Sequence, residues 1–252
     1  MRKLFKSANA SFTSNQLFKQ LTKGKHLELP TQKTTLQTDY NKYKYLIYGN
    51  PKVGKSTFAS KFDQAIFVAT EPGHNFLEIF KVDVKTWNDF REFAKAITTK
   101  PHPYKTIVVD TVDNLYKMCE QSVLDANKVQ HASDLPFGKG FILIKDEFMK
   151  VINYLGNSGF GFVFISHAKE KELKTKTTTW TTMTTSLNNQ AESFICGLCD
   201  FIFYCYLNDK GERLMKTKSE KYINAGSRGF DLPSPMPMDY EQLMKHFKGE
   251  KK

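Results

Sequence analysis

The segment YLIYGNPKVGKSTFASKF, residues Tyr45–Phe62, carries the strongest structural signal in this chain. It begins with an apolar run typical of a buried strand, passes through GNPKVGKST and continues into a segment with helical character. The middle part matches G-x-x-x-x-G-K-[ST] and stands between a strand and a helix, the context in which this motif binds phosphate. We therefore expect a phosphate-binding loop at Gly49–Thr57.

The residue types in this loop have separate roles. Gly49 and Gly54 allow the backbone to turn successive N–H groups toward phosphate oxygens, and the start of the helix adds a partial positive charge. Lys55 is expected to reach the β- and γ-phosphates, and the Ser56 hydroxyl to bind Mg²⁺. Thr57 should lie near the α-phosphate. The full predicted nucleotide-binding set is Gly49, Asn50, Pro51, Lys52, Val53, Gly54, Lys55, Ser56 and Thr57.

The rest of the chain alternates short apolar runs with segments of helical periodicity. We expect strands at 45–49, 65–70, 106–110, 162–166 and 201–206, and helices at 86–98, 112–127 and 141–156. Shorter strands at 213–218 and 221–226 and a closing helix near 239–247 should follow. Strands that are apolar throughout predict a mostly parallel twisted sheet covered by helices on both faces, an α/β fold.

Charge divides the chain into two predicted parts, a flexible basic arm at 1–40 and a domain at 41–252. The 252 residues include 37 Lys or Arg and 26 Asp or Glu, a net charge of +11, and residues 1–45 hold nine basic and two acidic residues. Such an arm suggests a polyanion partner, most simply nucleic acid. The alternative is a solvated leader that aids solubility. Without a membrane-length apolar run or a secretory h-region, we expect a cytoplasmic protein with no membrane partner.

Two carboxylates follow predicted strands that neighbour the loop. Asp110 ends KTIVVD and is the expected second Mg²⁺-site residue, acting through water. The next residue is Thr111, not a Glu, so the base that activates water must come from elsewhere. Glu71, at the end of AIFVATE, fits because the carboxyl ends of parallel strands converge on one crevice. The alternative for Glu71 is a solvated carboxylate before a Pro-Gly turn.

The loop, a Glu closing the next strand, and an apolar strand ending in Asp-Thr together resemble the RecA/KaiC-type ATPases. More narrowly, residues 43–240 resemble the small phage RecA-like ATPases of the Sak single-strand annealing group. The resemblance implies a RecA-like P-loop NTPase core that hydrolyses ATP with Mg²⁺. It also implies ATP-dependent binding and annealing of single-stranded DNA in phage recombination or replication. A homo-oligomer, ring or filament, is expected in the host cytoplasm, with a single-strand-binding protein as a further candidate partner.

The same resemblance assigns roles to residues late in the chain. His167, with Ser166, ends FVFISH, where a polar γ-phosphate sensor belongs, although RecA proteins usually carry Gln there. Lys216 and Lys218 match a Lys-x-Lys pair that reaches a neighbouring subunit's nucleotide, with Arg228 as a further candidate. Otherwise His167 is a hydrogen-bonded residue at a strand end without catalytic duty, and the two lysines form the solvated face of a strand.

The segment KEKELKTKTTTWTTMTTSLNNQ, residues 169–190, follows the sensor strand and is rich in Lys and Thr. It favours an extended hairpin. Cations can hold a phosphate backbone and an indole can stack on an unpaired base, so the predicted DNA-binding residues are Lys169, Lys171, Lys174, Lys176 and Trp180. The alternative is a surface hairpin whose Trp packs on its own domain. Lys139, between two glycines, is a weaker DNA candidate.

The remaining signals favour simpler roles or keep rival functions open. Cys196 and Cys199 have C-x-x-C spacing without a second pair nearby, which favours core packing over a metal site. One rival function is a nucleotide-switched adaptor or loader with little hydrolysis. The other is a P-loop small-molecule or nucleotide kinase, for which the Arg-rich lid is missing.

Overall fold

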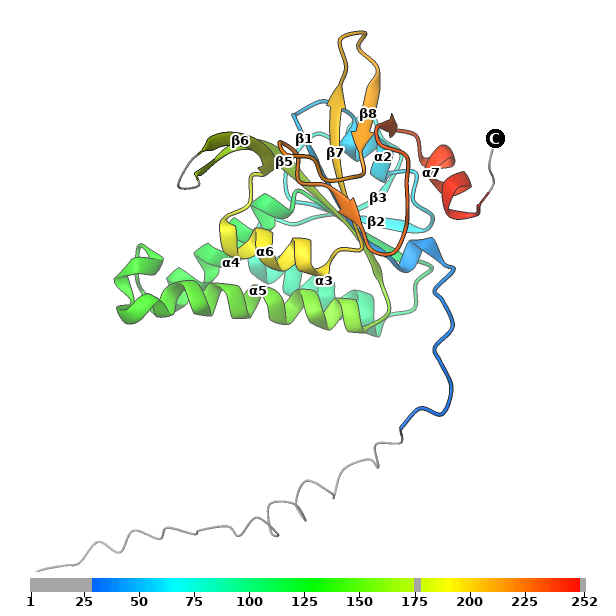
Figure 1. Cartoon of the computed structure of the whole chain (residues 1–252). Coiled ribbons are helices and arrows are strands. Elements are labelled where there is room, and N and C mark those ends of the chain that lie inside the picture. Colours follow the sequence, from blue (N-terminus) through cyan, green and yellow to red (C-terminus); the bar gives the residue numbers. More distant parts are fainter. Residues whose placement is uncertain (1–28, 175–177, 250–252) are drawn as a thin grey trace, which may run out of the picture. The chain divides into compact units, whose positions relative to one another are not determined.

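The computed structural model describes residues 29–174 and 178–249 and divides the chain into two units, Met1–Thr38 and Asp39–Lys252. In the first unit, residues 29–38 form neither helix nor strand, and Leu29 and Leu36 are exposed. Every described helix and strand belongs to the second unit (Figure 1). This unit begins at the short 3-10 helix η1 (Tyr40–Lys42), where the Tyr40 ring stacks on Phe247.

The second unit is built on one twisted sheet. Its strands are β1 (Lys44–Gly49), β2 (Ala65–Ala69), β3 (Phe80–Asp83), β4 (Thr106–Asp110), β5 (Gly161–Lys174), β6 (Thr179–Thr185), β7 (Phe201–Leu207), β8 (Arg213–Lys216), β9 (Gly226–Ser227) and β10 (Met236–Pro237). They lie in the order β10-β8-β7-β1-β5-β4-β2-β3, with β6 paired to β5 and β9 to β7. The run from β7 to β3 is parallel, whereas β6, β8, β9 and β10 pair antiparallel.

Helices cover both faces of this sheet (Figure 1). They are α2 (Lys55–Ala59), α3 (Trp87–Thr99), α4 (Val112–Asn127), α5 (Lys139–Asn157), α6 (Asn189–Leu198) and α7 (Tyr240–Phe247), with the 3-10 turns η2 (Ala132–Asp134) and η3 (Pro136–Gly138) before α5. The apolar sides of α3, α4, α5 and α6 pack with one face of the central strands in the larger core cluster. Helices α2 and α7 pack with the opposite face in the smaller cluster.

The central strands are buried because helices lie on both sides of them. Alternate residues of β1 belong to different core clusters: Leu46 packs with α3–α6, and Tyr45 and Ile47 pack with α2 and α7. A strand covered on both faces must be apolar at every position, which is why YLIYG carries no polar alternation. The predicted α/β class with a mostly parallel sheet is confirmed.

The sequence-based predictions fail mainly at the sheet margins. The expected strand at 213–218 ends at Lys216, and 221–226 contributes only an isolated bridge at Ile223 before β9. Strand β3 was not predicted because all four of its residues are exposed, and α6 was missed beside the Thr-rich segment. Within the described residues, no helix has the length and apolarity needed to cross a membrane.

Candidate nucleotide site

The sheet register brings the predicted nucleotide-site residues to one edge. Gly49 at the end of β1 pairs with His167 on β5 and with Cys205 on β7. One strand further along, Asp110 pairs with Ile165 on β5, and Ala69 of β2 lies opposite Asp110. The carboxyl ends of β1, β2 and β4 therefore converge where a parallel sheet binds its ligand.

The phosphate loop needs its two glycines for different reasons. A Cβ on Gly49 would lie 2.2 Å from the carbonyl oxygen of Cys205, so the loop leaves β1 in direct contact with the β7 backbone. Gly54 has φ 104°, in the left-handed region that side chains disfavour, and it caps the start of α2. Sequence spacing thus located a loop whose backbone path requires glycine at both positions.

Lys55 is buried beneath this loop. Its ammonium donates hydrogen bonds to the carbonyl oxygens of Gly49 and Asn50, both at 2.9 Å. Burial lowers the pKa of Lys55 from its ordinary value, and the nearby Cys205 and Asp110 groups oppose that shift. A lysine ammonium has three donors, so one remains for an anion, and a bound polyphosphate would stabilise the charged form.

The two predicted Mg²⁺ ligands meet in the structure. The Ser56 hydroxyl donates a 2.6 Å hydrogen bond to Oδ2 of Asp110. A hydroxyl and a carboxylate at this separation are hard oxygen donors of the kind Mg²⁺ prefers. His74, absent from the sequence-based prediction, lies on the same oxygen, with Nε2 2.9 Å from Asp110 Oδ2 and its ring buried. The one signal for His74 was its place just after the Glu-Pro-Gly turn.

Thr70 locks the ends of β2 and β4 together. Its hydroxyl oxygen accepts a hydrogen bond from the Thr111 N–H at 2.8 Å and donates one to the Thr111 carbonyl at 3.0 Å, while its own N–H donates to Asp110 O. Glu71, the next residue, is thereby held near the end of β4. The predicted proximity of Glu71 and Asp110 rests on this lock.

Glu71 and the predicted sensor His167 face one another. Glu71 Oε1 lies 3.5 Å from His167 Nε2, and Glu71 Oε2 accepts a hydrogen bond from Asn114 at 3.2 Å. The Nδ1 atom of His167 is buried and has no hydrogen-bond partner among the described residues. The predicted base and the predicted sensor therefore form one unit beside the phosphate loop.

Asp113, which the sequence-based prediction missed, joins three segments at this edge. Its carboxylate accepts hydrogen bonds from the Ser166 hydroxyl at 2.9 Å, from the His167 N–H at 3.3 Å and from the Ser186 hydroxyl. The Ser186 N–H in turn donates to the His167 carbonyl at 2.8 Å. Asp113 thus ties the start of α4 to the sensor strand and to the end of β6. A second acid three residues after the strand-ending Asp110 was the available signal.

The predicted Lys-x-Lys pair is divided in the structure. Lys216 ends β8 and binds Glu220 at 2.7 Å, whereas Lys218 lies beyond the strand and binds Asp231 at 2.6 Å. The alternative of a shared strand face does not hold for Lys218, because β8 ends at Lys216. Their proposed action on a neighbouring subunit's nucleotide stays a prediction.

Arg228 lies just after β9, near the end of β7 that is remote from the phosphate loop. Its backbone N–H donates to Asp200 O just before β7 begins, whereas Cys205, near the other end of β7, contacts Gly49. A role toward a neighbouring subunit stays a prediction for Arg228.

The predicted hairpin after the sensor strand is confirmed, with Ala168–Lys174 of β5 pairing with Thr179–Thr185 of β6. Cross-strand pairing places Lys169, Lys171 and Leu173 on one face with Trp180, and strand alternation places Lys174 on the other. Lys169 donates to Leu187 O at 2.5 Å, and Lys171 donates to Asn189 at 3.0 Å. Lys176 lies outside the described residues. DNA binding by this set stays a prediction.

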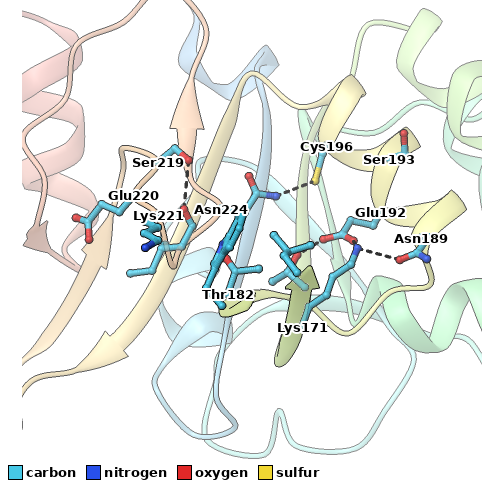
Figure 2. A pocket seen from close by; sticks show the side chains of 14 residues that line it. Lys171, Thr182, Asn189, Glu192, Ser193, Cys196, Ser219, Glu220, Lys221 and Asn224 are labelled. Carbon is cyan, nitrogen blue, oxygen red and sulfur yellow. Dashed lines mark hydrogen bonds and ion pairs between the residues drawn. The ribbon is translucent and has the colours of Figure 1, made fainter. Parts of the chain in front are cut away.

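Trp180 opens onto a pocket of about 470 Å³ between the hairpin, α6 and residues 219–224. Figure 2 shows Lys171 of the hairpin beside Glu192 and Asn189 of α6, and Asn224 directed toward Cys196. The Lys221 ammonium lies 5.9 Å from the Trp180 ring centroid, within cation–π range. The indole is therefore half-buried against its own domain, as the alternative reading of this segment held, while one side of it borders an open pocket.

Two minor candidates are also placed. Lys139 is exposed at the start of α5, next to Gly140, which packs on the Ala132 carbonyl. Cys199 is buried in the larger core cluster with Cys196 packed against it, and burial raises the pKa of Cys196 to about 11. The C-x-x-C pair serves core packing.

The strand order, the phosphate loop and the Ser56–Asp110 pair define a RecA-like P-loop NTPase core. The chain belongs to the AAA domain family, whose model (AAA_24) matches residues 41–229. Membership supports nucleotide binding and hydrolysis as the general activity of this domain. Among solved structures, the chain is similar to a KaiC-like protein of the hyperthermophilic archaeon Pyrococcus horikoshii OT3, with TM-score 0.43 and 15% identity over 75% of this chain and 83% of that one. Comparison with curated proteins finds no match.

Proposed function

We propose that this protein hydrolyses ATP with Mg²⁺ to drive binding and annealing of single-stranded DNA in phage recombination or replication. The observation that carries the proposal is the continuous strand β5, which passes from the sensor position His167 beside the phosphate loop directly into the Lys- and Thr-rich hairpin. The resemblance of the motifs to the phage Sak-group ATPases supports the DNA reaction and an oligomeric state.

The site residues divide the hydrolytic work. Lys55 would bind phosphate oxygens, and Ser56 and Asp110 would hold Mg²⁺, which neutralises phosphate charge when bound. Glu71 would orient and deprotonate the attacking water, because its carboxylate is partly exposed and stands at the strand ends. His167, in contact with Glu71, would report the state of the γ-phosphate to the hairpin.

The hydrogen bonds of Asp113 connect His167 to the hairpin. Its carboxylate binds both the His167 N–H and the Ser186 hydroxyl, at the two residues where the hairpin leaves and rejoins the domain. A shift of His167 on hydrolysis would therefore move both hairpin strands. Such coupling needs two conformations of the β5–β6 hairpin, each favoured by a different ligand.

An annealing assay tests the proposal. Complementary labelled strands should anneal faster with protein and ATP than with protein alone, and Lys55→Ala should remove the ATP-dependent part. Equal annealing rates with and without ATP would contradict an ATP-driven DNA reaction.

The adaptor or loader is the second candidate, favoured by a His at the sensor position where RecA proteins usually carry Gln. It predicts tight ATP binding with negligible turnover. The kinase has less support, because the sequence holds four arginines and no Arg cluster; transfer of labelled phosphate to an acceptor would favour it.

A further inference from the structure

Arg213 is placed beside the phosphate loop by the hairpin between β7 and β8. Its backbone pairs with Leu207 of β7, and its carbonyl accepts a 3.0 Å hydrogen bond from the Met238 N–H. Strand alternation puts Arg213 on the same side as Met215, which packs in the core cluster that contains Val53 of the loop. The backbone of Arg213 is therefore held from both sides, on the face of the sheet that carries the loop.

The Arg213 side chain crosses directly over Gly54. A Cβ on Gly54 would lie 3.2 Å from both Cδ and Nε of Arg213, and no other described group outside the adjoining residues lies within 4 Å of that point. The aliphatic part of the Arg213 side chain thus covers the second loop glycine, and the first guanidinium nitrogen, Nε, lies next to the loop backbone.

The Arg213 guanidinium has no partner in the part of the chain that the structure describes, where it makes neither a hydrogen bond nor an ion pair. The three late basic residues that the family resemblance singled out differ from it: Lys216, Lys218 and Arg228 each face a carboxylate of their own chain. Five N–H donors next to a phosphate-binding backbone are suited to bidentate contact with an anion.

We infer that Arg213 is a nucleotide-binding residue that acts within its own subunit and contacts the phosphate oxygens of the nucleotide in the loop. The inference rests on the proposed nucleotide function and adds a second cation to Lys55. Lys55 is buried and bonds the carbonyl oxygens of Gly49 and Asn50 at the start of the loop, whereas Arg213 is exposed and lies against Gly54 near its end. The two cations would hold the polyphosphate between them.

Calorimetric titration of the full chain with ATP and with inorganic tripolyphosphate, both in Mg²⁺, tests this role. Arg213→Ala should weaken the affinity for both ligands about tenfold to a hundredfold, the usual effect of a charge-assisted hydrogen bond. Arg213→Lys should recover part of the loss, because it keeps the charge without the planar fork. Lys210→Ala, at the exposed turn of the same hairpin, should bind like the wild type.

The outcomes separate this inference from the proposed function. Unchanged affinities in Arg213→Ala, with Lys55→Ala still impaired, would overturn the role of Arg213 alone. Weakened ATP binding with unchanged tripolyphosphate binding would assign Arg213 to the base or sugar and overturn the phosphate contact. A wild-type chain that binds neither ligand would overturn the nucleotide function together with the inference.

Discussion

The nucleotide edge of the sheet and the β5–β6 hairpin share one strand, but they hold their polar side chains differently. At the edge, the buried Asp110 carboxylate accepts a hydrogen bond from the Ser56 hydroxyl and lies within hydrogen-bond distance of the His74 ring. On the hairpin, Lys174 has most of its side chain exposed and, within the described residues, pairs only with Glu172 on its own strand. Buried polar groups need fixed partners, whereas exposed lysines gain little from theirs, so the edge is preorganised and the hairpin is adaptable.

The largest expected effect is at the preorganised edge. Lys55→Ala should reduce ATP turnover by about 10²–10³-fold or more, because the loop loses the buried cation that stabilises transferring phosphate. Steady-state release of phosphate measures it. Lys61→Ala, an exposed lysine just beyond α2, is the matched control and should keep full turnover. Full activity in Lys55→Ala would show that ATP is not hydrolysed at this loop.

Gly49→Ala tests how rigidly the loop is attached to β7. Since the new Cβ would meet the Cys205 carbonyl oxygen at 2.2 Å, the backbone must move, and we expect unfolding free energy to fall by about 1–3 kcal/mol. Urea denaturation gives this value. Gly197→Ala on α6, where a Cβ meets nothing within 4 Å, should match or slightly exceed wild-type stability. Equal unfolding free energies for Gly49→Ala and Gly197→Ala would show that the loop can move away from β7 at little cost.

Trp180→Ala tests the adaptable region. Loss of a stacking indole should weaken single-stranded DNA binding by about 1–3 kcal/mol, measured by fluorescence anisotropy. Tyr154→Ala, a half-exposed aromatic on α5, serves as the control and should leave affinity unchanged. If Trp180→Ala also binds DNA normally, the indole serves only to pack against Lys221 and the pocket wall.

These two regions also differ in how far the sequence could predict them. The loop was predicted to the residue because backbone geometry demands glycine at 49 and 54, and this demand leaves a fixed spacing. The hairpin was predicted as a whole, but which of its lysines share a face with Trp180 depends on the register with which β6 pairs with β5. His74 and Asp113 were missed because their roles arise from contacts between segments distant in sequence. The role inferred for Arg213 likewise depends on a contact between distant segments, the β7–β8 hairpin and the phosphate loop.

The smallest expected effect is that of the basic N-terminal segment. Because Tyr40 packs on Phe247, a clean truncation removes residues 1–38, which hold seven Lys or Arg residues. If these residues bind phosphates, the slope of log affinity against log salt should become less negative by about 0.7 for each phosphate that the truncated protein no longer neutralises. Replacing the seven by Gln in the full chain should give the same change. An unaltered slope in both would identify the segment as a solvated leader.

In the proposed function, strand β5 couples the nucleotide edge of the sheet to a DNA-binding hairpin. Steady-state ATP hydrolysis with and without single-stranded DNA, with Lys55→Ala as the blank, tests this coupling most directly. We predict that single-stranded DNA raises turnover and that the blank shows none in either condition. Turnover that ignores DNA, or that never exceeds the blank, would contradict the claim and favour the kinase or the nucleotide-switched adaptor.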